Sequence, residues 1–259
     1  MNYLLAAAAG AIQGLTEFLP ISSTGHLIIF EKFLSLDPNS FGLAFDASLH
    51  LGTLLAVLAI FKNDYLKILN FKNRLWGKLL LGTIPAAAAG LLFENYINTA
   101  LRQTAIVALS LIVFSFVFIA AEKLAKQHKV KEQTSLFDAL IIGAAQAVAL
   151  IPGVSRSGST ISAGLFLGLK RAESAKFSFM LSGPIIFAAG AKKFFDLTAV
   201  SSVGSQNFTL AAIGIVSSAV FGYLTIKYFL KYLQTKTLYP FVVYRVILGI
   251  ILLLWNSKI

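Results

Sequence analysis

The amino-acid sequence predicts an all-α polytopic membrane protein built from two inverted-topology repeats, each with one re-entrant helical hairpin and three transmembrane helices. Three observations predict this fold class. The chain is 57% hydrophobic and only 13% charged, its two halves match at a constant offset, and its basic residues gather between apolar runs. A soluble domain of this size needs more charge to cover its surface. We expect residues 1–259 to form a single integral membrane domain, with repeat one at about 1–125 and repeat two at about 134–259.

Six uninterrupted apolar stretches approach the roughly 20 helical residues that cross a hydrocarbon core of about 30 Å. They lie at 43–61, 75–93, 105–121, 174–191, 208–226 and 241–255. Two further apolar stretches, 3–34 and 137–168, are each interrupted by a proline and a cluster of serine and glycine. Each of these two is either a full span with a surface helix or a re-entrant hairpin that enters and leaves on one side.

The distribution of basic residues decides between these two alternatives. If both interrupted stretches are re-entrant, the basic segments 62–74, 122–133, 170–173 and 227–237 all fall on the cytoplasmic side. That arrangement obeys the positive-inside rule with only Lys192 and Lys193 on the outer side, whereas two full crossings would break the rule. Three spans per repeat is an odd number, so the second repeat must be inverted. The two hairpins then enter from opposite faces, and their polar tips can meet near the midplane.

The two halves of the chain match without a gap at an offset of 133 residues through residues 10–25, and at an offset of 132 further along, where Gly82 aligns with Gly214. The offset of 133 aligns Gln13 with Gln146, and it aligns the string SSTG at 22–25 with SRSG at 155–158. Isolated matches of small residues arise by chance in an apolar chain. A match that runs through two polar motifs indicates an internal repeat of the kind that many membrane transporters contain.

Composition also excludes several classes of function. The net charge of +11 resides largely in short loops, which suit anionic lipid headgroups, so membrane lipids and no nucleic acid are the expected partners. The absence of cysteine excludes a disulfide, a thiolate metal site and a thiol nucleophile. The sequence leaves open whether the chain works as a monomer or as a homodimer.

The tip of the first predicted hairpin has the composition of an anion site. Gln13 and Glu17 are four residues apart and share one helical face, and Pro20 ends that half-helix. The second half-helix begins at a cluster of small polar residues, where unpaired backbone N–H groups and the helix dipole favour anions. This cluster comprises Ser22, Ser23, Thr24 and Gly25. His26 follows it and is a candidate nucleophile, base or acid.

The second hairpin supplies an arginine at its tip. Arg156 offers a planar fork of donors that matches two phosphate oxygens. An arginine at membrane depth is unfavourable unless it is paired or hydrated, which indicates a functional role. The alternative is that Arg156 only pairs with Glu17 and holds the two hairpins together. The remaining candidate binding residues of this tip are Ser155, Ser157, Gly158 and Thr160.

Asp46 and His50 are four residues apart on the next predicted span. They act in the site or line it as polar packing residues, and the sequence does not decide between the two.

Three strings of the chain resemble the undecaprenyl-diphosphate phosphatases, a family also called BacA or UppP and linked to bacitracin resistance. The strings are QGLTEFLPISSTGHL at 13–27, FDASLHLGTLLAV at 45–57 and IPGVSRSGSTISAGLFLG at 151–168. Together with the pattern of spans, the resemblance covers nearly the whole chain.

The resemblance implies hydrolysis of undecaprenyl diphosphate, a polyprenyl diphosphate lipid, to the monophosphate, which recycles the lipid carrier of cell-wall precursors. It also implies a location in the cell inner membrane, a site that opens to the periplasmic side, and dependence on a divalent cation, Mg²⁺ or Ca²⁺. By motif position, the metal-binding acidic pair of the family falls on Gln13 and Glu17. The first of these positions is a Glu in members with an E-x-x-x-E motif, so here Glu17 must carry the carboxylate chemistry.

The resemblance places the catalytic residues at Glu17, Ser23, His26 and Arg156. In the preferred mechanism Ser23 attacks the terminal phosphorus and His26 is its proton partner. In the alternatives His26 itself attacks, or it activates a water. A flippase that moves undecaprenyl phosphate or another anionic lipid is the rival function, because inverted repeats with broken helices also build transporters.

Overall fold

The structure, a computed structural model, describes residues 1–68, 74–199 and 205–256 of the chain. Within these ranges every regular element is a helix, and the only β-type pairing is an isolated bridge between Lys129 and Leu169. The prediction of an all-α protein is therefore confirmed.

Four helices are long and apolar enough to cross a membrane. They are α3 (Leu43–Ile60), α5 (Leu75–Leu92), α7 (Thr104–Leu124) and α11 (Ser205–Tyr232), the last of which qualifies from Phe208 onward. The predicted spans 174–191 and 241–255 fall within two further helices, α10 (Arg171–Ala199) and α12 (Tyr239–Asn256). In the described residues these two do not meet the same criterion of length and apolarity. The multi-pass membrane character is confirmed.

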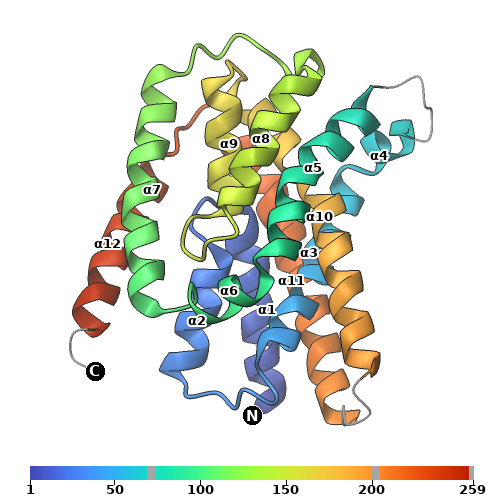
Figure 1. The fold of residues 1–259 in the computed structure, drawn as a ribbon, viewed down its shortest axis with the longest axis vertical. Coiled ribbons are helices and arrows are strands. Elements are labelled where there is room, and N and C mark those ends of the chain that lie inside the picture. The colour runs from blue at the N-terminus through green and yellow to red at the C-terminus, as the bar shows by residue number, and fades with distance from the viewer. Residues whose placement is uncertain (69–73, 200–204, 257–259) are drawn as a thin grey trace.

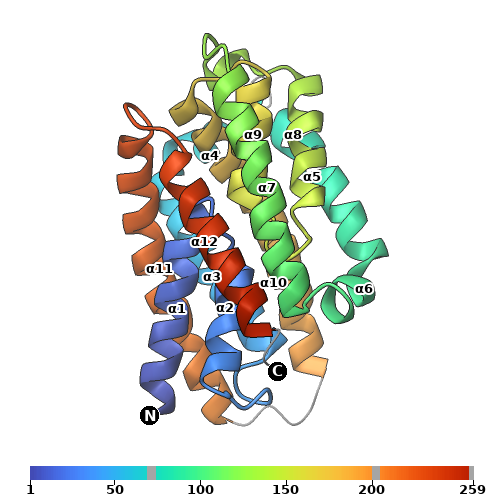
Figure 2. The ribbon, with the colours of Figure 1, turned by 90° about the vertical axis from the view of Figure 1, so that its left-hand side faces the viewer.

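Each interrupted stretch forms a helical hairpin. The first consists of α1 (Asn2–Phe18) and α2 (Ser23–Phe33), and the second of α8 (Leu136–Val148) and α9 (Arg156–Phe166). The first hairpin occupies the lower half of the molecule and the second the upper half, and their turns lie near mid-height (Figures 1 and 2). The tips are thus close to one another although they are more than 100 residues apart in the sequence.

The second half-helix of each hairpin starts with the same unusual backbone conformation. The residue before α2 is Ser22, with φ 72°, and the residue before α9 is Ser155, with φ 77°. Positive φ is uncommon for a residue with a Cβ and carries strain of about 1–3 kcal/mol. Each serine caps its own helix, since its Oγ accepts the N–H of Gly25 at 3.4 Å or of Gly158 at 3.2 Å, which offsets part of that strain. The two capping serines are a pair that the offset of 133 aligns.

Glycines bring the helices around the hairpins into backbone contact. A Cβ at Gly10 of α1 would overlap the carbonyl oxygen of Gly214 on α11. A Cβ at Gly143 of α8 would overlap the carbonyl oxygen of Gly82 on α5. Close approach through small residues increases the dispersion contacts between helices, which replace the hydrophobic effect inside a bilayer. These contacts fix each hairpin against a span.

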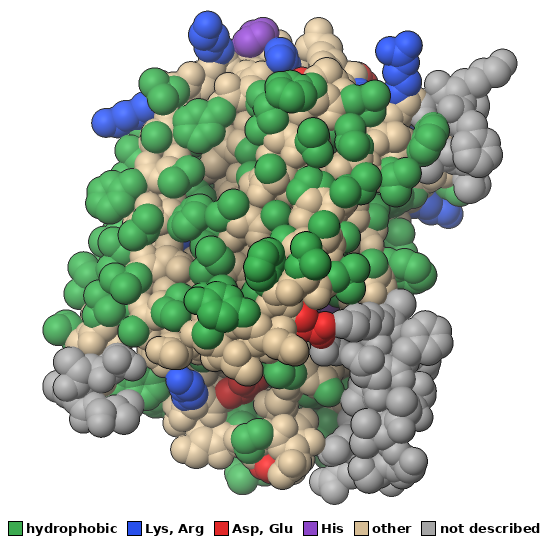
Figure 3. Space-filling view, viewed as in Figure 1, with side chains coloured by type: hydrophobic (Ala, Val, Ile, Leu, Met, Phe, Trp, Pro, Cys, Tyr) green, Lys and Arg blue, Asp and Glu red, His purple; other side chains and the backbone are tan. Residues whose placement is uncertain are grey.

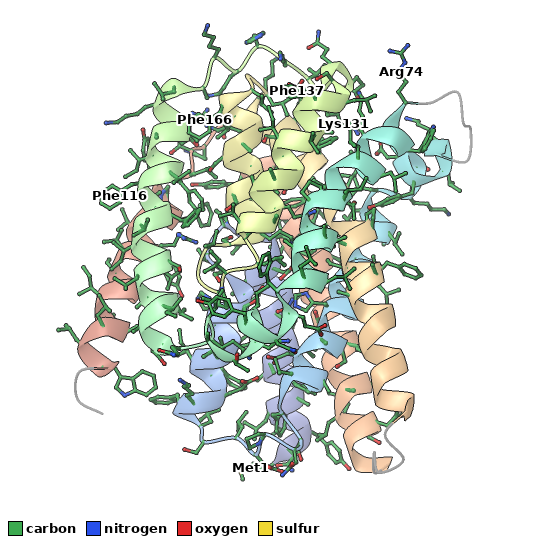
Figure 4. All side chains as sticks on the ribbon, in the orientation of Figure 1. Met1, Arg74, Phe116, Lys131, Phe137 and Phe166 are labelled. Atoms are coloured by element: carbon green, nitrogen blue, oxygen red, sulfur yellow. The ribbon has the colours of Figure 1, made fainter. Side chains whose placement is uncertain are left out.

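The two ends of the molecule differ in charge. Most of the lysine and arginine side chains visible in Figure 3 gather at the upper end, where Figure 4 places Arg74 and Lys131, and Met1 lies at the opposite end. The surface between the ends is largely apolar (Figure 3). Its exposed side chains include Leu80, Ile84, Leu109, Val113, Phe116, Val216, Val243, Ile247 and Ile250. Such a surface is unfavourable in water and suits a lipid environment.

Three short helices complete the described chain. α4 (Lys62–Ile68) and the 3₁₀ helix η1 (Lys131–Gln133) belong to the connections at the basic end. α6 (Glu94–Thr99) lies in the connection between α5 and α7, on the other side of the hairpin tips (Figure 1).

Substituting Gly143 by Ala is expected to destabilise the protein by about 1–3 kcal/mol, because the added methyl group meets backbone that cannot move aside. The matched control is Gly77→Ala on α5, where the nearest atom to a Cβ is a Leu136 methyl carbon at 3.7 Å. The control should be neutral or stabilising by up to about 1 kcal/mol, because Ala is the better helix former. Thermal unfolding of the purified proteins in one detergent measures both, and equal stabilities would contradict the assigned contact.

Candidate active site

A cavity of about 450 Å³ lies where the two hairpin tips meet α3, α5 and α10. Its polar wall consists of Glu17, Ser22, Ser23, Thr24, Asp46, His50, Glu94, Asn98, Arg102, Ser155 and Arg156. Its apolar wall comes mainly from α5 and α10, and includes Ala86, Ala87, Gly90, Leu91, Ile185, Ile186 and Ala189. A cavity with a cluster of convergent polar groups and an apolar wall has the character of a ligand site, here for a molecule with a polar head and an apolar tail.

Glu17 is the centre of the polar wall. Its carboxylate is buried and accepts three hydrogen bonds. Arg156 Nη2 donates to Oε1 at 2.5 Å, Gln13 Nε2 donates to Oε2 at 3.0 Å, and the Ser23 hydroxyl donates to Oε2 in a short hydrogen bond. A buried charge is tolerated when a counterion and hydrogen-bond donors compensate it, and Glu17 has both. Because Gln13 and Glu17 belong to α1 and Arg156 to α9, the ion pair also joins the two hairpins.

His50 of α3 is the histidine that lines this cavity. Its Nδ1 lies 3.0 Å from Gln13 Nε2 and 3.7 Å from Glu17 Oε1. Gln13 must turn its amide nitrogen toward the carboxylate, since its own oxygen would be repelled there, and that nitrogen can only donate. The Nδ1 of His50 therefore accepts, and its proton is assigned to Nε2. A neutral His50 can donate one hydrogen bond to a bound anion.

The hairpin tips contact each other directly. The N–H of Gly153 donates to Ser22 Oγ at 3.1 Å, and the Ser157 hydroxyl donates to the carbonyl oxygen of Leu19 at 3.0 Å. These bonds hold the first turns of α2 and α9 beside the same cavity, which Ser23 and Arg156 line. Two helix N-termini thus end at one polar site, the arrangement that favours an anion.

His26 lies outside this arrangement. Its Nδ1 is 2.7 Å from the carbonyl oxygen of Ser22, and its Nε2 is 2.6 Å from the hydroxyl of Tyr244 on α12. The expected contact between His26 and Ser23 is not found among the described hydrogen bonds, because the Ser23 hydroxyl is bound to Glu17 instead. The two side chains leave α2 in different directions, and His26 does not line the cavity.

Four of the predicted binding residues support the tips from behind and do not line the cavity. The N–H groups of Gly25 and Gly158 bind the capping serines, and a Cβ at Gly158 would overlap the ring of Phe118. Thr160 is fully buried, and its hydroxyl lies 2.7 Å from the carbonyl oxygen of Arg156 and 2.5 Å from Ser178 Oγ on α10. Ser157 is occupied by its bond to Leu19. Of the predicted set, the structure brings Glu17, Ser22, Ser23, Thr24, Ser155 and Arg156 together in the cavity wall.

This region also contains two arginines that the motifs do not identify. Arg102 lines the outer part of the cavity, where its Nη2 lies 2.9 Å from Asp46 Oδ2 and 3.8 Å from Glu31 Oε2. Nothing in the sequence distinguishes it from other loop cations. Arg245 is fully buried and contacts both tips. An arginine inside the apolar run 241–255 itself indicates a functional role. Arg245 lies outside the three matching strings, so a comparison of motifs does not find it.

The donor atoms near Glu17 can supply part of the ligand set of a divalent cation. In the described residues no three His, Asp or Glu side chains form a cluster that could hold a metal ion alone. The Oε1 of Gln13, however, is buried and has no hydrogen-bond partner in the part of the chain that the structure describes, and Gln13 lies on the same face of α1 as Glu17. Amide and carboxylate oxygens are the ligands that Mg²⁺ and Ca²⁺ prefer, so the pair fits an ion that takes its other ligands from phosphate and water.

Comparison with known proteins gives a consistent result over nearly the whole chain. Residues 6–251 match the family model described as bacitracin resistance protein BacA. Among curated proteins, the chain is 40% identical over 259 residues to an undecaprenyl-diphosphatase of Rubrobacter xylanophilus, with 95% of each protein covered. It is 43% identical over 245 residues to that of Thermodesulfovibrio yellowstonii, covering 95% of this chain and 94% of the relative. It is also 43% identical over 267 residues to that of Hahella chejuensis, with 98% of each protein covered.

The geometry predicts that Glu17 competes with anions for Arg156. The substitution Glu17→Gln should tighten binding of inorganic pyrophosphate at least about 10-fold, because the guanidinium loses its counterion and a bound anion restores it. Isothermal titration of the purified protein in detergent measures this. The matched control is Glu122→Gln, which releases Arg171 from its pair (Nη2–Oε2 2.6 Å) and should leave pyrophosphate binding unchanged. Weaker binding by Glu17→Gln would contradict the assigned competition.

Proposed function

The chain belongs to the bacitracin resistance protein BacA family and hydrolyses undecaprenyl diphosphate to undecaprenyl phosphate and inorganic phosphate, and we propose that it does so in the cavity between the hairpin tips. The product is the lipid carrier for cell-wall synthesis, which the reaction recycles. The observation that carries the location of the site is the hydroxyl of Ser23, hydrogen-bonded to a buried carboxylate beside an arginine. The comparisons give no support to the alternative of a flippase.

Arg156 is the principal phosphate ligand in this proposal. On binding, the diphosphate takes the place of Glu17 at part of the guanidinium, which keeps donors for two phosphate oxygens. The first turns of α2 and α9 add backbone N–H groups, and His50 Nε2–H adds one further donor. Phosphoryl transfer depends mainly on positioning and on stabilising charge in the transition state, which is what these groups supply.

Ser23 is the proposed nucleophile, and Glu17 is its proton acceptor. A bond forms between Ser23 Oγ and the terminal phosphorus, and the bond from that phosphorus to the bridging oxygen breaks. The proton of Ser23 passes through Glu17 to the departing undecaprenyl phosphate. A water then attacks the phosphoserine; one of its protons goes to Ser23 Oγ and the other stays on the released phosphate. The hydrogen bond between Ser23 and Glu17 supports this assignment over His26 as the proton partner.

A divalent cation, Mg²⁺ or Ca²⁺, is proposed at Glu17 and Gln13. When bound, it neutralises negative charge on the phosphate oxygens. The support is the buried Oε1 of Gln13, which has no hydrogen-bond partner among the described residues, on a side chain that contacts the Glu17 carboxylate. Glu17 would be free to offer a carboxylate oxygen as a ligand once Arg156 binds the substrate phosphate instead.

The first isoprene units are proposed to lie along the apolar wall between α5 and α10. Small side chains such as Ala86 and Gly90 leave room on that wall. Each of the two helices also contains a proline, Pro85 or Pro184, which removes a backbone hydrogen bond and weakens the helix locally. A polyprenyl chain placed there can continue into the bilayer.

The architecture is proposed to be two inverted repeats in the cell inner membrane, with the site open to the periplasmic side. The paired capping conformations of Ser22 and Ser155 support the repeat. The basic end of the molecule in Figure 3 supports a cytoplasmic upper face. Glu94 and Asn98 of α6 and the loop residue Arg102 also line the cavity, and α6 lies on the side of the tips away from the basic end. This supports access to the cavity from the periplasm.

Release of inorganic phosphate from undecaprenyl diphosphate by the purified protein tests the proposal. With Mg²⁺ present, Ser23→Ala should lower kcat about 10³-fold or more, because the nucleophile is lost, and Arg156→Ala should lower it at least about 10²-fold. The matched control outside the cavity is Ser217→Ala, a half-buried serine whose Oγ bonds the Ala7 carbonyl and which should retain activity. Near-normal turnover of Ser23→Ala would remove the serine nucleophile. A folded wild-type protein that binds the lipid but releases no phosphate would favour the transporter.

The substitution Gln13→Glu is expected to lower the Mg²⁺ concentration for half-maximal activity about 10-fold, because a second carboxylate raises the charge of the proposed metal site. EDTA should abolish the activity of both forms. The control is Gln103→Glu, the same chemical change at an exposed position before α7. An unchanged Mg²⁺ titration for Gln13→Glu would show that this side chain does not hold the ion.

A further inference from the structure

Arg245 is the largest fully buried side chain of the described protein. It lies inside α12, six residues after the start of that helix. Every hydrogen-bond acceptor that the described residues provide for it is neutral. Burying a cation away from water without a carboxylate partner costs several kcal/mol per ion, so its surroundings must compensate for the lost hydration.

Two of its acceptors are equivalent positions of the two hairpin tips. Arg245 Nη1 donates to the carbonyl oxygen of Pro20 at 3.3 Å, and Nη2 donates to that of Gly153 at 3.0 Å. The offset of 133 that aligns the two halves of the chain also aligns Pro20 with Gly153. Each of these residues stands two positions before a capping serine with positive φ. One guanidinium therefore binds the same point of both tips.

The other side of the guanidinium is held by α7. Nε donates to Ser115 Oγ at 3.2 Å, and Nη2 also approaches the carbonyl oxygen of Ser110 at 3.3 Å. The guanidinium carbon lies 4.6 Å from the centre of the Phe118 ring, a cation–π distance. Phe118 is the same ring that packs against Gly158 in the first turn of α9. Arg245 is thus fixed from behind and can act as a rigid link.

We propose that Arg245 is a positioning residue, which sets the distance and angle between the two hairpin tips and so aims Ser23 and Arg156 at the same phosphate. The inference rests on the proposed function, because it concerns the geometry of that reaction. Arg245 does not line the cavity and is given no direct contact with the substrate. Its effect passes through the carbonyl oxygens of Pro20 and Gly153 to the helices that begin three residues later.

This role predicts a separation of kcat from KM. Arg156 and the apolar wall bind the substrate in its ground state, and the long side chain of Arg156 can keep its contact with a phosphate when the tips shift slightly. The alignment of nucleophile and phosphate is needed mainly in the transition state, and a misplacement of about 1 Å can lower the rate about 100-fold. A residue that only stabilises the fold would change neither constant of the molecules that remain folded.

The test compares Arg245→Lys with wild type, using kcat and KM for phosphate release from undecaprenyl diphosphate in detergent with Mg²⁺. Lysine keeps the charge but lacks the fork that reaches two carbonyl oxygens at once. We expect kcat to fall about 10–100-fold and KM to stay within about 3-fold. The matched control is Arg171→Lys, at the ion pair with Glu122, which should change the thermal unfolding midpoint without changing kcat. A wild-type kcat for folded Arg245→Lys would overturn the inference, and so would an equal loss of kcat in the control.

A second variant decides the matter if Arg245→Lys does not fold. Ser115→Ala removes only the hydroxyl that holds Nε, in a small change that a helix tolerates. We expect a fall in kcat of about 3-fold with unchanged KM. An unchanged kcat for Ser115→Ala would overturn the inference. Inactive wild-type protein would instead remove the proposed function, so the two failures are distinguishable.

Discussion

The ion pair between Glu17 and Arg156 is the interaction on which the rest of the structure depends. Each charge lies at the tip of a hairpin that ends inside the protein, and each would be unstable there without the other. The pair forms only when the two tips meet, so it selects the docked arrangement of two hairpins from opposite halves of the molecule. Gln13 and Ser23 complete the shell of the carboxylate, and in doing so they bring the proposed nucleophile to its proton acceptor. Structural stability and chemistry thus use the same few atoms.

Much of this arrangement could be predicted from the sequence, because the physical signals are strong. A bilayer requires about 20 apolar residues per span, and each of the six predicted spans lies within a helix, to within one residue at its end. A broken helix at membrane depth needs protein or water around its free backbone groups, and the polar strings at 22–25 and 155–158 mark where the breaks occur. The spacing of Gln13 and Glu17 places both on one face of α1, and the structure shows them joined at 3.0 Å.

The direction in which each side chain leaves its helix could not be predicted in the same way. Periodicity tells which residues share a face of α2, but not which neighbour that face meets, since the rotation of the hairpin depends on packing from distant segments. Ser23 and His26 are three residues apart, yet one bonds Glu17 and the other Tyr244 of α12. His50 reaches the cavity from α3 because that span packs beside α1. Arg102 stands in a loop, where sequence gives no information on position.

The charges that line the cavity bear on how a diphosphate can bind there. Arg102 and Arg156 are the two cations, whereas Glu17, Asp46 and Glu94 are three carboxylates, and His50 is assigned as neutral. The cavity alone therefore has no excess of positive charge with which to receive a substrate that carries several negative charges. In surroundings of low dielectric, uncompensated negative charge is energetically unfavourable. Arg245 lies behind the tips and reaches the cavity only through the backbone. A divalent cation that enters with the substrate would restore the balance, and the unpartnered oxygen of Gln13 beside Glu17 is where the described residues leave an acceptor for it.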